Sequence, residues 1–468
     1  MLSKLTKNPI YYWILFFWFT QLINFSDGGV NANSRFAALR AMTLESSFKI
    51  DHNYDWTIDW SRTPDGHYYS NKAPGPMFVA YPLAFILDQI GVKTGFISKT
   101  VVNSVPVYER PGIHYKLLLS WLLQALPFGI LTFFLLEYLA EMGLSFEARN
   151  FAALAILFGN TAVFFMNNYF GHGMAATFVL GIILAYLRKN YFWVGFCYGF
   201  ATLCDYGAAL LVIPLMILLI SERRFSVWWE CALGGLLPGA LWIGYHTVCF
   251  GSPFSLPMKF QNPIFVEKTE PEKKIWGVIA PFPHFEILIE LLFKPRRGLL
   301  FTQPWIYPVF FISATLGILK KPLFNKKGFN GILLLSLLGL SALLWMNSGF
   351  NGWHGGGTPG PRYIALILPA IGLLGAYAYD LSSKVLRKFL WLTLSISVLF
   401  RIIVYCQDML CPEYAQLWQW FGSNLKLSPA TPSGRTFFLF ILLMIALVRK
   451  IFKERPQAPE TLSLNSKH

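Results

Sequence analysis

Long apolar segments recur along the chain from Tyr11 to Val448, separated by short polar segments. A helix needs about 20 apolar residues to cross the hydrocarbon layer, where its backbone groups must be satisfied within the segment. The pattern predicts about twelve membrane-spanning helices, at residues 9–26, 116–136, 150–167, 173–188, 191–205, 206–220, 229–250, 299–319, 329–347, 361–380, 387–406 and 435–451. We therefore expect an all-α integral membrane protein.

Short basic segments between these spans determine the expected orientation, because Lys and Arg near helix ends stay on the cytoplasmic side. Such segments lie at residues 188–189, 223–224, 320–327, 384–388 and 449–455. They place both termini in the cytoplasm. The first span is interpreted as a retained anchor because no small-residue cleavage site follows it. The polar tail at 454–468 is expected to be disordered and cytoplasmic.

One further apolar stretch, residues 75–90, does not fit this topology, because counting it as a span would turn the basic loops outward. Pro74, Pro76 and Pro82 are expected to interrupt any long regular helix there. We therefore interpret the stretch as a juxtamembrane helix at the outer interface. Residues 1–450 then form a single polytopic membrane domain, with large outer segments at 27–115 and 251–298.

The composition excludes a soluble globular protein, because 55% of the residues are hydrophobic and only 13% are charged. A net charge of +15 would suggest nucleic acid as the partner of a soluble protein. Here many basic residues flank apolar spans, so the lipid bilayer is the expected partner and nucleic acid is not. No metal-ligand spacing or nucleotide motif occurs, and we expect neither a metal nor a cofactor. Cys406 and Cys411 are close enough in sequence for a disulfide if the outer side is oxidising, and a reduced pair fits equally.

The first outer segment holds the densest group of acidic residues in the chain. Asp51, Asp55 and Asp59 recur every four residues, in a stretch that reads equally well as helical or extended. The simplest interpretation of each is a solvated carboxylate that pairs with a cation such as Arg35 or Lys72. The alternative is that one of them is a general base.

Two cationic positions in the same segment are candidates for binding a lipid phosphate. Residues 34–44 have a helical period with Ser34 as the expected N-cap, which places Arg35 and Arg40 near the membrane surface. Lys72 comes directly before a rigid Ala-Pro-Gly-Pro sequence. A lysine held at headgroup depth is a natural partner for a lipid phosphate, and one that reaches toward the interface without a ligand fits the sequence equally.

Later outer segments add two arginines. Arg296 lies in a Lys-Pro-Arg-Arg-Gly sequence that suits either phosphate binding or ordinary interfacial anchoring. Arg362 follows a Gly-rich segment, 351–361, whose backbone could approach a ligand closely. Further site candidates in the outer loops are His67, Tyr68 and His354. We expect a structural hydrogen bond from His172, on a very short turn, and Asp205 is the main candidate for an acid at membrane depth.

With these residues the chain resembles the GT-C superfamily of polytopic glycosyltransferases, in particular the branch of lipid A aminoarabinose transferases and protein O-mannosyltransferases. The resemblance rests on the anchor span, Ser-Arg-Phe-Ala at 34–37, Tyr-Tyr-Ser-Asn-Lys-Ala-Pro-Gly-Pro at 68–76 and Gly-Pro-Arg-Tyr at 360–363. It covers most of residues 1–450. It implies a GT-C-like fold whose first loop carries outer juxtamembrane helices.

The resemblance also implies an activity, namely transfer of a sugar from a polyprenyl-phosphate donor to a lipid, glycan or protein acceptor. The reaction would invert the sugar and take place on the outer face of a bacterial-type cytoplasmic membrane, in the cell envelope. Arg35 and Lys72 are similar to residues that hold the donor phosphate, and Arg296 and Arg362 are available to join them.

The sequence departs from this family at the usual catalytic acid. Relatives carry an Asp-Glu pair just before Ser-Arg-Phe, where this chain has Ala32 and Asn33. Asp59 is our first choice for the catalytic base because it precedes the lysine motif in the same loop, and Asp51 is the second. A base is needed because an acceptor hydroxyl is a poor nucleophile until its proton is removed.

The departure leaves a non-catalytic alternative open, a transporter of lipid-linked sugars or a scaffold of the same fold. Transporters often contain inverted repeats, and no repeat is visible in this chain. A third possibility is an enzyme similar to O-antigen ligases, which would transfer a whole glycan from a diphosphate carrier.

Overall fold

The computed structural model describes residues 8–23, 29–102, 105–265, 274–275, 279–318, 327–358, 360–407 and 432–454. The α-helices are α2 (Tyr12–Ile23), α3 (Gly29–Leu44), α4 (Gly75–Thr94), α5 (Ile113–Ser120), α6 (Leu126–Glu141), α7 (Phe146–Leu157), α8 (Gly171–Leu187), α9 (Tyr191–Cys204), α10 (Val212–Ser221), α11 (Ser226–Phe250), α12 (Phe285–Phe293), α13 (Leu299–Thr302), α14 (Ile306–Ile318), α15 (Lys327–Gly349), α16 (Leu368–Leu381), α17 (Lys384–Gln407) and α19 (Pro432–Lys453). Shorter helical turns are η1 (Pro9–Tyr11), η2 (Tyr54–Trp56), the π-helix η3 (Trp121–Ala125), η4 (Thr161–Phe165), η5 (Tyr206–Leu211), η6 (Pro257–Phe260), η7 (Pro263–Phe265) and η10 (Arg362–Ile367).

Each predicted span coincides with one helix or with a run of consecutive helices. Among the described residues, five helical segments are long and apolar enough to cross a membrane by length and composition, at Gly75–Thr94, Ile113–Glu141, Ser226–Phe250, Gly328–Gly349 and Arg362–Leu381. Shorter apolar helices lie at Pro9–Ile23, Gly171–Leu187, Tyr191–Cys204, Tyr206–Ser221 and Ile306–Thr315. Helices make up 74% of the structure. The predicted class, an all-α membrane protein, is confirmed.

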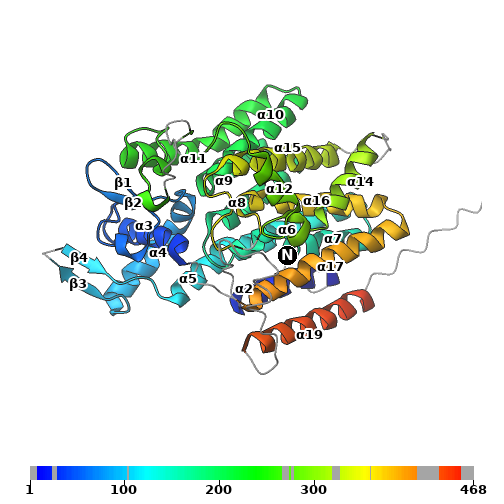
Figure 1. The fold of residues 1–468 in the computed structure, drawn as a ribbon, viewed down its shortest axis with the longest axis horizontal. Coiled ribbons are helices and arrows are strands. Elements are labelled where there is room, and N and C mark those ends of the chain that lie inside the picture. Colours follow the sequence, from blue (N-terminus) through cyan, green and yellow to red (C-terminus); the bar gives the residue numbers. More distant parts are fainter. Residues whose placement is uncertain are drawn as a thin grey trace, which may run out of the picture.

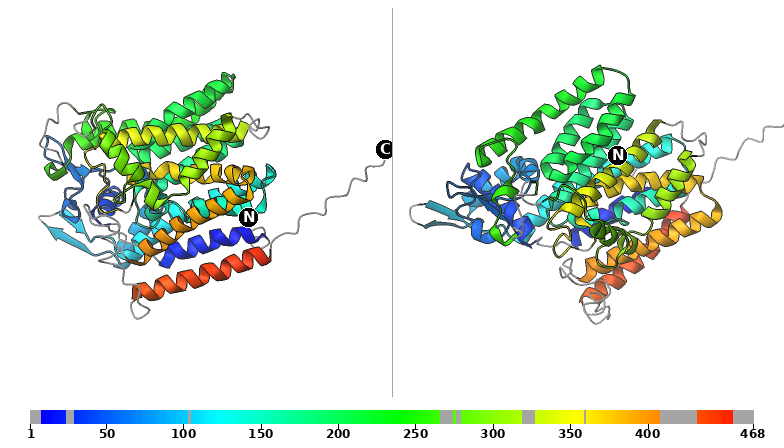
Figure 2. Two further views of the ribbon diagram at one scale, coloured as in Figure 1. Left: turned by 45° about the vertical axis from the view of Figure 1, so that its right-hand side comes forward. Right: turned by 45° about the horizontal axis from the view of Figure 1, so that its top comes forward.

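The long helices form a bundle, and the first outer segment covers one end of it. Figure 2 shows that the axes of α2, α15, α17 and α19 are nearly parallel, regardless of chain direction. The segments α3, α4 and the two small hairpins gather beyond one end of these helices (Figures 1 and 2). We call this the capped end. The apolar core of the bundle surrounds α16, whose residues are almost all buried against α7, α14 and α15.

Helix α4 is longer and more regular than predicted. It runs without a break from Gly75 to Thr94 and contains Pro82 in its interior. Pro76 lies in the first turn, where a backbone N–H has no partner within the helix, and Pro82 removes only one hydrogen bond from the helix. The prediction that prolines interrupt this stretch was therefore wrong.

Helix α3 is buried on nearly all sides. It begins at Gly29, so Ser34 lies inside the helix and is not its N-cap. The Ser34 hydroxyl donates to the backbone oxygen of Asp59 at 2.5 Å. Arg35 and Arg40 are both buried inside the protein. Arg40 Nη1 lies 2.6 Å from the Asp88 carboxylate, and this ion pair joins α3 to α4.

Two short antiparallel hairpins, not predicted from the sequence, lie at the capped end. Strands β1 (Trp60–Arg62) and β2 (Tyr68–Ser70) form the first hairpin, and β3 (Lys99–Val102) and β4 (Val105–Tyr108) form the second. In the first hairpin Trp60 pairs with Ser70. Asp59 precedes Trp60 and Lys72 follows shortly after Ser70, so the register brings Asp59 and Lys72 to the same end of the hairpin.

Two glycines allow three helix ends to meet at Cys204, the last residue of α9. A Cβ atom on Gly75, at the start of α4, would lie 2.6 Å from the Cys204 backbone nitrogen. A Cβ on Gly171, at the start of α8, would overlap the Cys204 carbonyl oxygen. Backbone is the obstacle in both cases, so the neighbour cannot move aside as a flexible side chain would. These contacts hold the starts of α4 and α8 against the end of α9.

We expect Gly171→Ala to lower the thermal midpoint and the yield of folded protein, because the added methyl group must displace the α9 backbone. The matched control is Gly244→Ala in α11, where a Cβ would meet nothing within 4 Å. The control is expected to be neutral or slightly stabilising, since alanine favours a helix over glycine by about 1 kcal/mol. Equal midpoints for the two variants in detergent would contradict this packing.

Candidate functional site

A cavity of about 330 Å³ lies at the capped end, where the loop after β2 meets the ends of several bundle helices. Its lining residues are Arg35, Asn71, Lys72, Ala73, His172, Cys204, Asp205, Tyr206, Gly207, Ala209, Trp242, Pro253, Phe254, Leu256, Met258, Gln261, Ile279, Met346, Phe350, Arg362 and Tyr363. Three of these are arginine or lysine side chains from distant parts of the sequence: Arg35, Lys72 and Arg362. The fold therefore gathers three of the four predicted phosphate-binding residues around one cavity.

Lys72 pairs with Asp59, which lies beside the cavity. Lys72 Nζ is 3.0 Å from Asp59 Oδ2, and both side chains are largely buried. The pKa of Lys72 is lowered to about 8, chiefly by burial, with the nearby charges of Arg362 and Arg35 acting in the same direction and the Asp59 carboxylate opposing them. Asp59 Oδ1 makes no hydrogen bond with any described residue. One oxygen of this carboxylate is thus held by a cation, and Asp59 lies behind Lys72 without itself lining the cavity.

Arg35 is a buried guanidinium with an unused donor. Its Nη1 donates to the backbone oxygen of Asn31 at 3.1 Å and also to the Asn31 side chain. Its Nε has no hydrogen-bond partner among the described residues, although it is fully buried. The pKa of Arg35 is lowered to about 10, chiefly by burial and also by the charge of Arg362. A buried N–H without an acceptor is costly, so this position suits an anionic ligand.

Arg362 belongs to a chain of three polar side chains. Its Nε donates to His172 Nε2 at 2.7 Å, and His172 Nδ1 lies 2.5 Å from Asp205 Oδ2. The sequence analysis expected a hydrogen bond at His172 and an acid at depth at Asp205, but it connected neither residue to the cations. Both residues line the cavity. The sequence feature that could have connected them to the site is their position, because each of them lies next to the end of a predicted helix.

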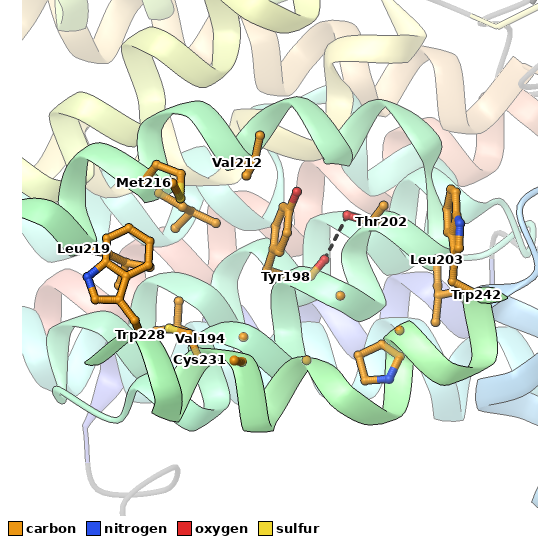
Figure 3. Close-up of a pocket in the computed structure, with 17 residues that line it drawn as sticks. Val194, Tyr198, Thr202, Leu203, Val212, Met216, Leu219, Trp228, Cys231 and Trp242 are labelled. Atoms are coloured by element: carbon orange, nitrogen blue, oxygen red, sulfur yellow. Dashed lines mark hydrogen bonds between the residues drawn. The ribbon is translucent and has the colours of Figure 1, made fainter. Parts of the chain in front are cut away.

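An apolar groove of about 430 Å³ lies between α9, α10 and α11, next to this cavity. Figure 3 shows Leu203 and Trp242 at one end of the groove and Trp228 and Leu219 toward the other. Trp242 lines both the groove and the polar cavity. Val212 and Met216 in the groove wall are exposed, so the groove is open to the surroundings, which in a membrane are lipid chains.

Asp51, His67 and Tyr68 form a separate network near the protein surface. Asp51 Oδ2 lies 2.7 Å from His67 Nδ1, and its other oxygen accepts from the Tyr68 backbone N–H at 2.7 Å. Tyr68 also stacks on Tyr54, with ring centroids 4.5 Å apart. None of these side chains lines the cavity. The structure therefore brings Asp59, and not Asp51, next to the three cations.

The Gly-rich segment is held by Arg297, the neighbour of the predicted Arg296. Arg297 is fully buried and donates to the backbone oxygens of His354 and Gly356, at 2.9 and 2.7 Å. Arg296 instead lies over the Trp353 ring, 5.0 Å from its centroid, and does not line the cavity. The His354 ring accepts from the Gly356 backbone. His354 and Arg296 thus support the segment that leads to Arg362.

Asn33, at the position where the sequence resemblance predicts an acid, contacts a lysine. Lys116 Nζ donates to Asn33 Oδ1 at 2.8 Å, and both side chains are buried. Within the described part of the chain, no group of three or more His, Cys, Asp or Glu side chains could hold a metal ion. Cys411 lies outside the described residues, so the disulfide with Cys406 stays a prediction.

Comparisons with known proteins give a structural similarity but no sequence match. No family model matches the chain, and no curated protein sequence matches it. Among solved structures, the chain is similar to the crystal structure of ArnT from Cupriavidus metallidurans bound to undecaprenyl phosphate, with 14% sequence identity and a TM-score of 0.47. The alignment covers 85% of this chain and 70% of that chain. ArnT is a GT-C aminoarabinose transferase, the branch that the sequence resembles. At this identity the likeness concerns the fold alone.

Proposed function

We propose that the protein is a GT-C-type glycosyltransferase whose cavity binds the phosphate of a polyprenyl-phosphate sugar. The observation that carries this proposal is the charge of the site. Arg35, Lys72 and Arg362 contribute three cations to a largely buried site in which, of the residues that the structure describes, Asp59 and Asp205 supply the carboxylates. One positive charge therefore lacks a counter-charge among the described residues, and burying it is costly until an anion binds.

The single unbalanced positive charge of the site favours a donor whose sugar is linked to the lipid through one phosphate over a donor linked through a diphosphate. The phosphodiester of a polyprenyl monophosphate sugar carries one negative charge, which balances the site, whereas a diphosphate carrier brings two. The adjacent apolar groove supports the same ligand, because Trp242 joins a cationic cavity to a long apolar surface (Figure 3). A prenyl chain lying in this groove would place its phosphate near Arg362 and Lys72.

We assign the general base to Asp59. Asp205 also borders the cavity, but Gly207 N–H binds one of its oxygens and His172 contacts the other. Asp59 retains an oxygen without a protein donor. In the proposed reaction Asp59 takes the proton of the acceptor hydroxyl, and the hydroxyl oxygen bonds to the anomeric carbon with inversion. The bond from that carbon to the phosphate oxygen breaks, and polyprenyl phosphate leaves with the electron pair, stabilised by the cations.

We place the site on the outer side of the cytoplasmic membrane, at the capped end. The basic loops on the other side support this orientation, which puts both termini in the cytoplasm. Residues 1–450 are then one membrane domain, and the segments 27–115 and 251–298 form its outer face. The acceptor would be a lipid, glycan or protein of the cell envelope that reaches this face.

The experiment that tests this function is a transfer assay with purified protein in liposomes. Radiolabelled polyprenyl monophosphate sugars, presented singly, are expected to lose label to an envelope lipid or glycan fraction. A polyprenyl diphosphate oligosaccharide serves as the competing donor and is expected to give no product. Transfer from the diphosphate donor alone would overturn the assignment in favour of a ligase-like enzyme.

The lowered pKa of Lys72 predicts how phosphate binding depends on pH. Below about pH 8 Lys72 is protonated in the empty site and can pair with the phosphate; above it the empty protein loses this proton, and binding must recover it. The affinity for undecaprenyl phosphate is therefore expected to fall as the pH rises from about 7 to about 10. Lys72→Arg stays charged over this range and should show a flatter profile. Identical profiles for the two proteins would contradict the role of Lys72.

The buried contact between Asn33 and Lys116 favours a second candidate, a non-catalytic protein that binds lipid-linked sugars. Such a protein would bind undecaprenyl phosphate at the same cations but transfer no sugar. Binding without transfer, with every donor and envelope fraction tested, would select this alternative.

A further inference from the structure

Three helix ends meet at His172 beside the cavity. His172 lies in the first turn of α8, Asp205 caps the start of η5, and Arg362 begins η10. Asp205 is held firmly, because its Oδ1 accepts from the Gly207 backbone N–H at 3.0 Å. His172 and Asp205 are buried, with relative exposures of 7% and 9%. The polar contacts between these three residues are therefore made away from bulk water.

The donor and acceptor roles in this chain follow from Arg362. A guanidinium can only donate, so His172 Nε2 must accept the 2.7 Å hydrogen bond from Arg362 Nε. The imidazole is then neutral and carries its proton on Nδ1. That proton is donated to Asp205 Oδ2, 2.5 Å away. Asp205 thus selects the one tautomer of His172 that can accept from Arg362.

The geometry points to His172 as a positioning residue that keeps the charge of Arg362 available to the ligand. The inference rests on the proposed phosphate site. His172 stands between Asp205 and Arg362 and prevents the carboxylate from pairing directly with the guanidinium. Asp205 consequently makes no direct ion pair with Arg362, although it still orients the guanidinium through the imidazole.

The other contacts of Arg362 leave one nitrogen for the cavity. Nη1 donates to the Gly355 backbone oxygen at 3.3 Å, and the guanidinium carbon lies 4.9 Å from the centre of the Phe170 ring. Nη2 makes no hydrogen bond with any described residue. His172 makes the shorter of the two hydrogen bonds to Arg362, so it contributes most to the direction in which Nη2 points. An arginine oriented before its ligand arrives loses less side-chain entropy on binding.

Three substitutions separate the role toward Arg362 from the role toward Asp205. His172→Gln can place an amide oxygen near the position of Nε2 and still accept from Arg362. His172→Asn can place an amide N–H near the position of Nδ1 and still donate to Asp205. It provides no acceptor for Arg362, and its shorter side chain leaves room for Asp205 to pair directly with Arg362. Asp205→Asn can donate to Nδ1, which moves the ring proton to Nε2, where it opposes the Arg362 donor.

The experiment measures binding of undecaprenyl phosphate to purified wild-type protein and to these variants, together with their thermal midpoints. His172→Asn and Asp205→Asn are expected to weaken binding by about 10- to 100-fold, the usual cost of losing a hydrogen bond to a charged group. His172→Gln is expected to restore most of the affinity. A structural role alone would lower the midpoints without this difference between Gln and Asn.

The outcomes distinguish this inference from the proposed function. If the wild-type protein does not bind undecaprenyl phosphate, the proposed phosphate site itself fails. If the wild type binds and His172→Asn binds equally well, His172 does not position Arg362 and the inference is overturned. Should the His172 variants fail to fold, Asp205→Asn decides, and wild-type affinity in that variant overturns the inference.

Discussion

Replacing Asp59 by Asn is expected to lower the rate of sugar transfer by about 100- to 10,000-fold, the usual contribution of a positioned general base. The amide cannot take the proton of the acceptor hydroxyl, but it has nearly the same shape as the carboxylate. The KM for the donor is expected to stay the same or to fall, because Lys72 loses the carboxylate that competes with the phosphate. Initial rates with a labelled donor, together with KM, measure both effects.

Two aspartates of the same segment serve as controls for this variant. Asp55→Asn removes an exposed carboxylate and is expected to keep the wild-type rate. Asp51→Asn tests the second candidate base, whose oxygens contact His67 and the Tyr68 backbone outside the cavity. If Asp51→Asn abolishes transfer and Asp59→Asn does not, the assignment of the base to Asp59 is wrong.

Replacing Lys72 by Met is expected to reduce kcat by about 100- to 1,000-fold, because a fixed cation no longer meets the charge that develops on the leaving phosphate. Lys49→Met is the matched control, since Lys49 Nζ contacts His67 at 2.8 Å and lies away from the cavity. Lys72→Met is also expected to destabilise the protein, because Asp59 becomes a buried carboxylate without its partner.

The double variant Lys72→Met/Asp59→Asn separates these two effects. It removes both charges of the pair, so it is expected to regain much of the thermal stability that Lys72→Met loses. It is not expected to regain activity. Recovery of transfer in the double variant would show that Lys72→Met acts through folding alone and that Lys72 does not stabilise the leaving group.

The spans could be predicted from the sequence because the bilayer imposes a length and a composition on every crossing helix. Even the short segments corresponding to α9 and to η5 with α10 were predicted, although only Asp205 separates them. The two hairpins were missed because strands of three and four residues in a polar segment have no clear alternating pattern. The continuous helix through Pro82 was missed because tertiary packing tolerates the loss of one backbone bond.

The cavity could be predicted only in part. Arg35, Lys72 and Arg362 were found because each is a cation in or next to a predicted outer segment, yet Arg296 meets the same criterion and lies outside the cavity. The sequence does not reveal which of two adjacent arginines is buried, and here the buried one is Arg297. The contacts of His172 with Asp205 and Arg362 depend on three distant helix ends meeting, which no local pattern encodes.

The position of the lipid phosphate tests the central claim most directly. An experimental structure of the protein in lipid nanodiscs saturated with undecaprenyl phosphate is expected to show the phosphate within hydrogen-bond distance of Arg35, Lys72 and Arg362. Its prenyl chain is expected to enter the groove between α9 and α11 past Trp242. A phosphate bound elsewhere, with these three side chains unchanged and their cavity empty, would contradict the proposed site.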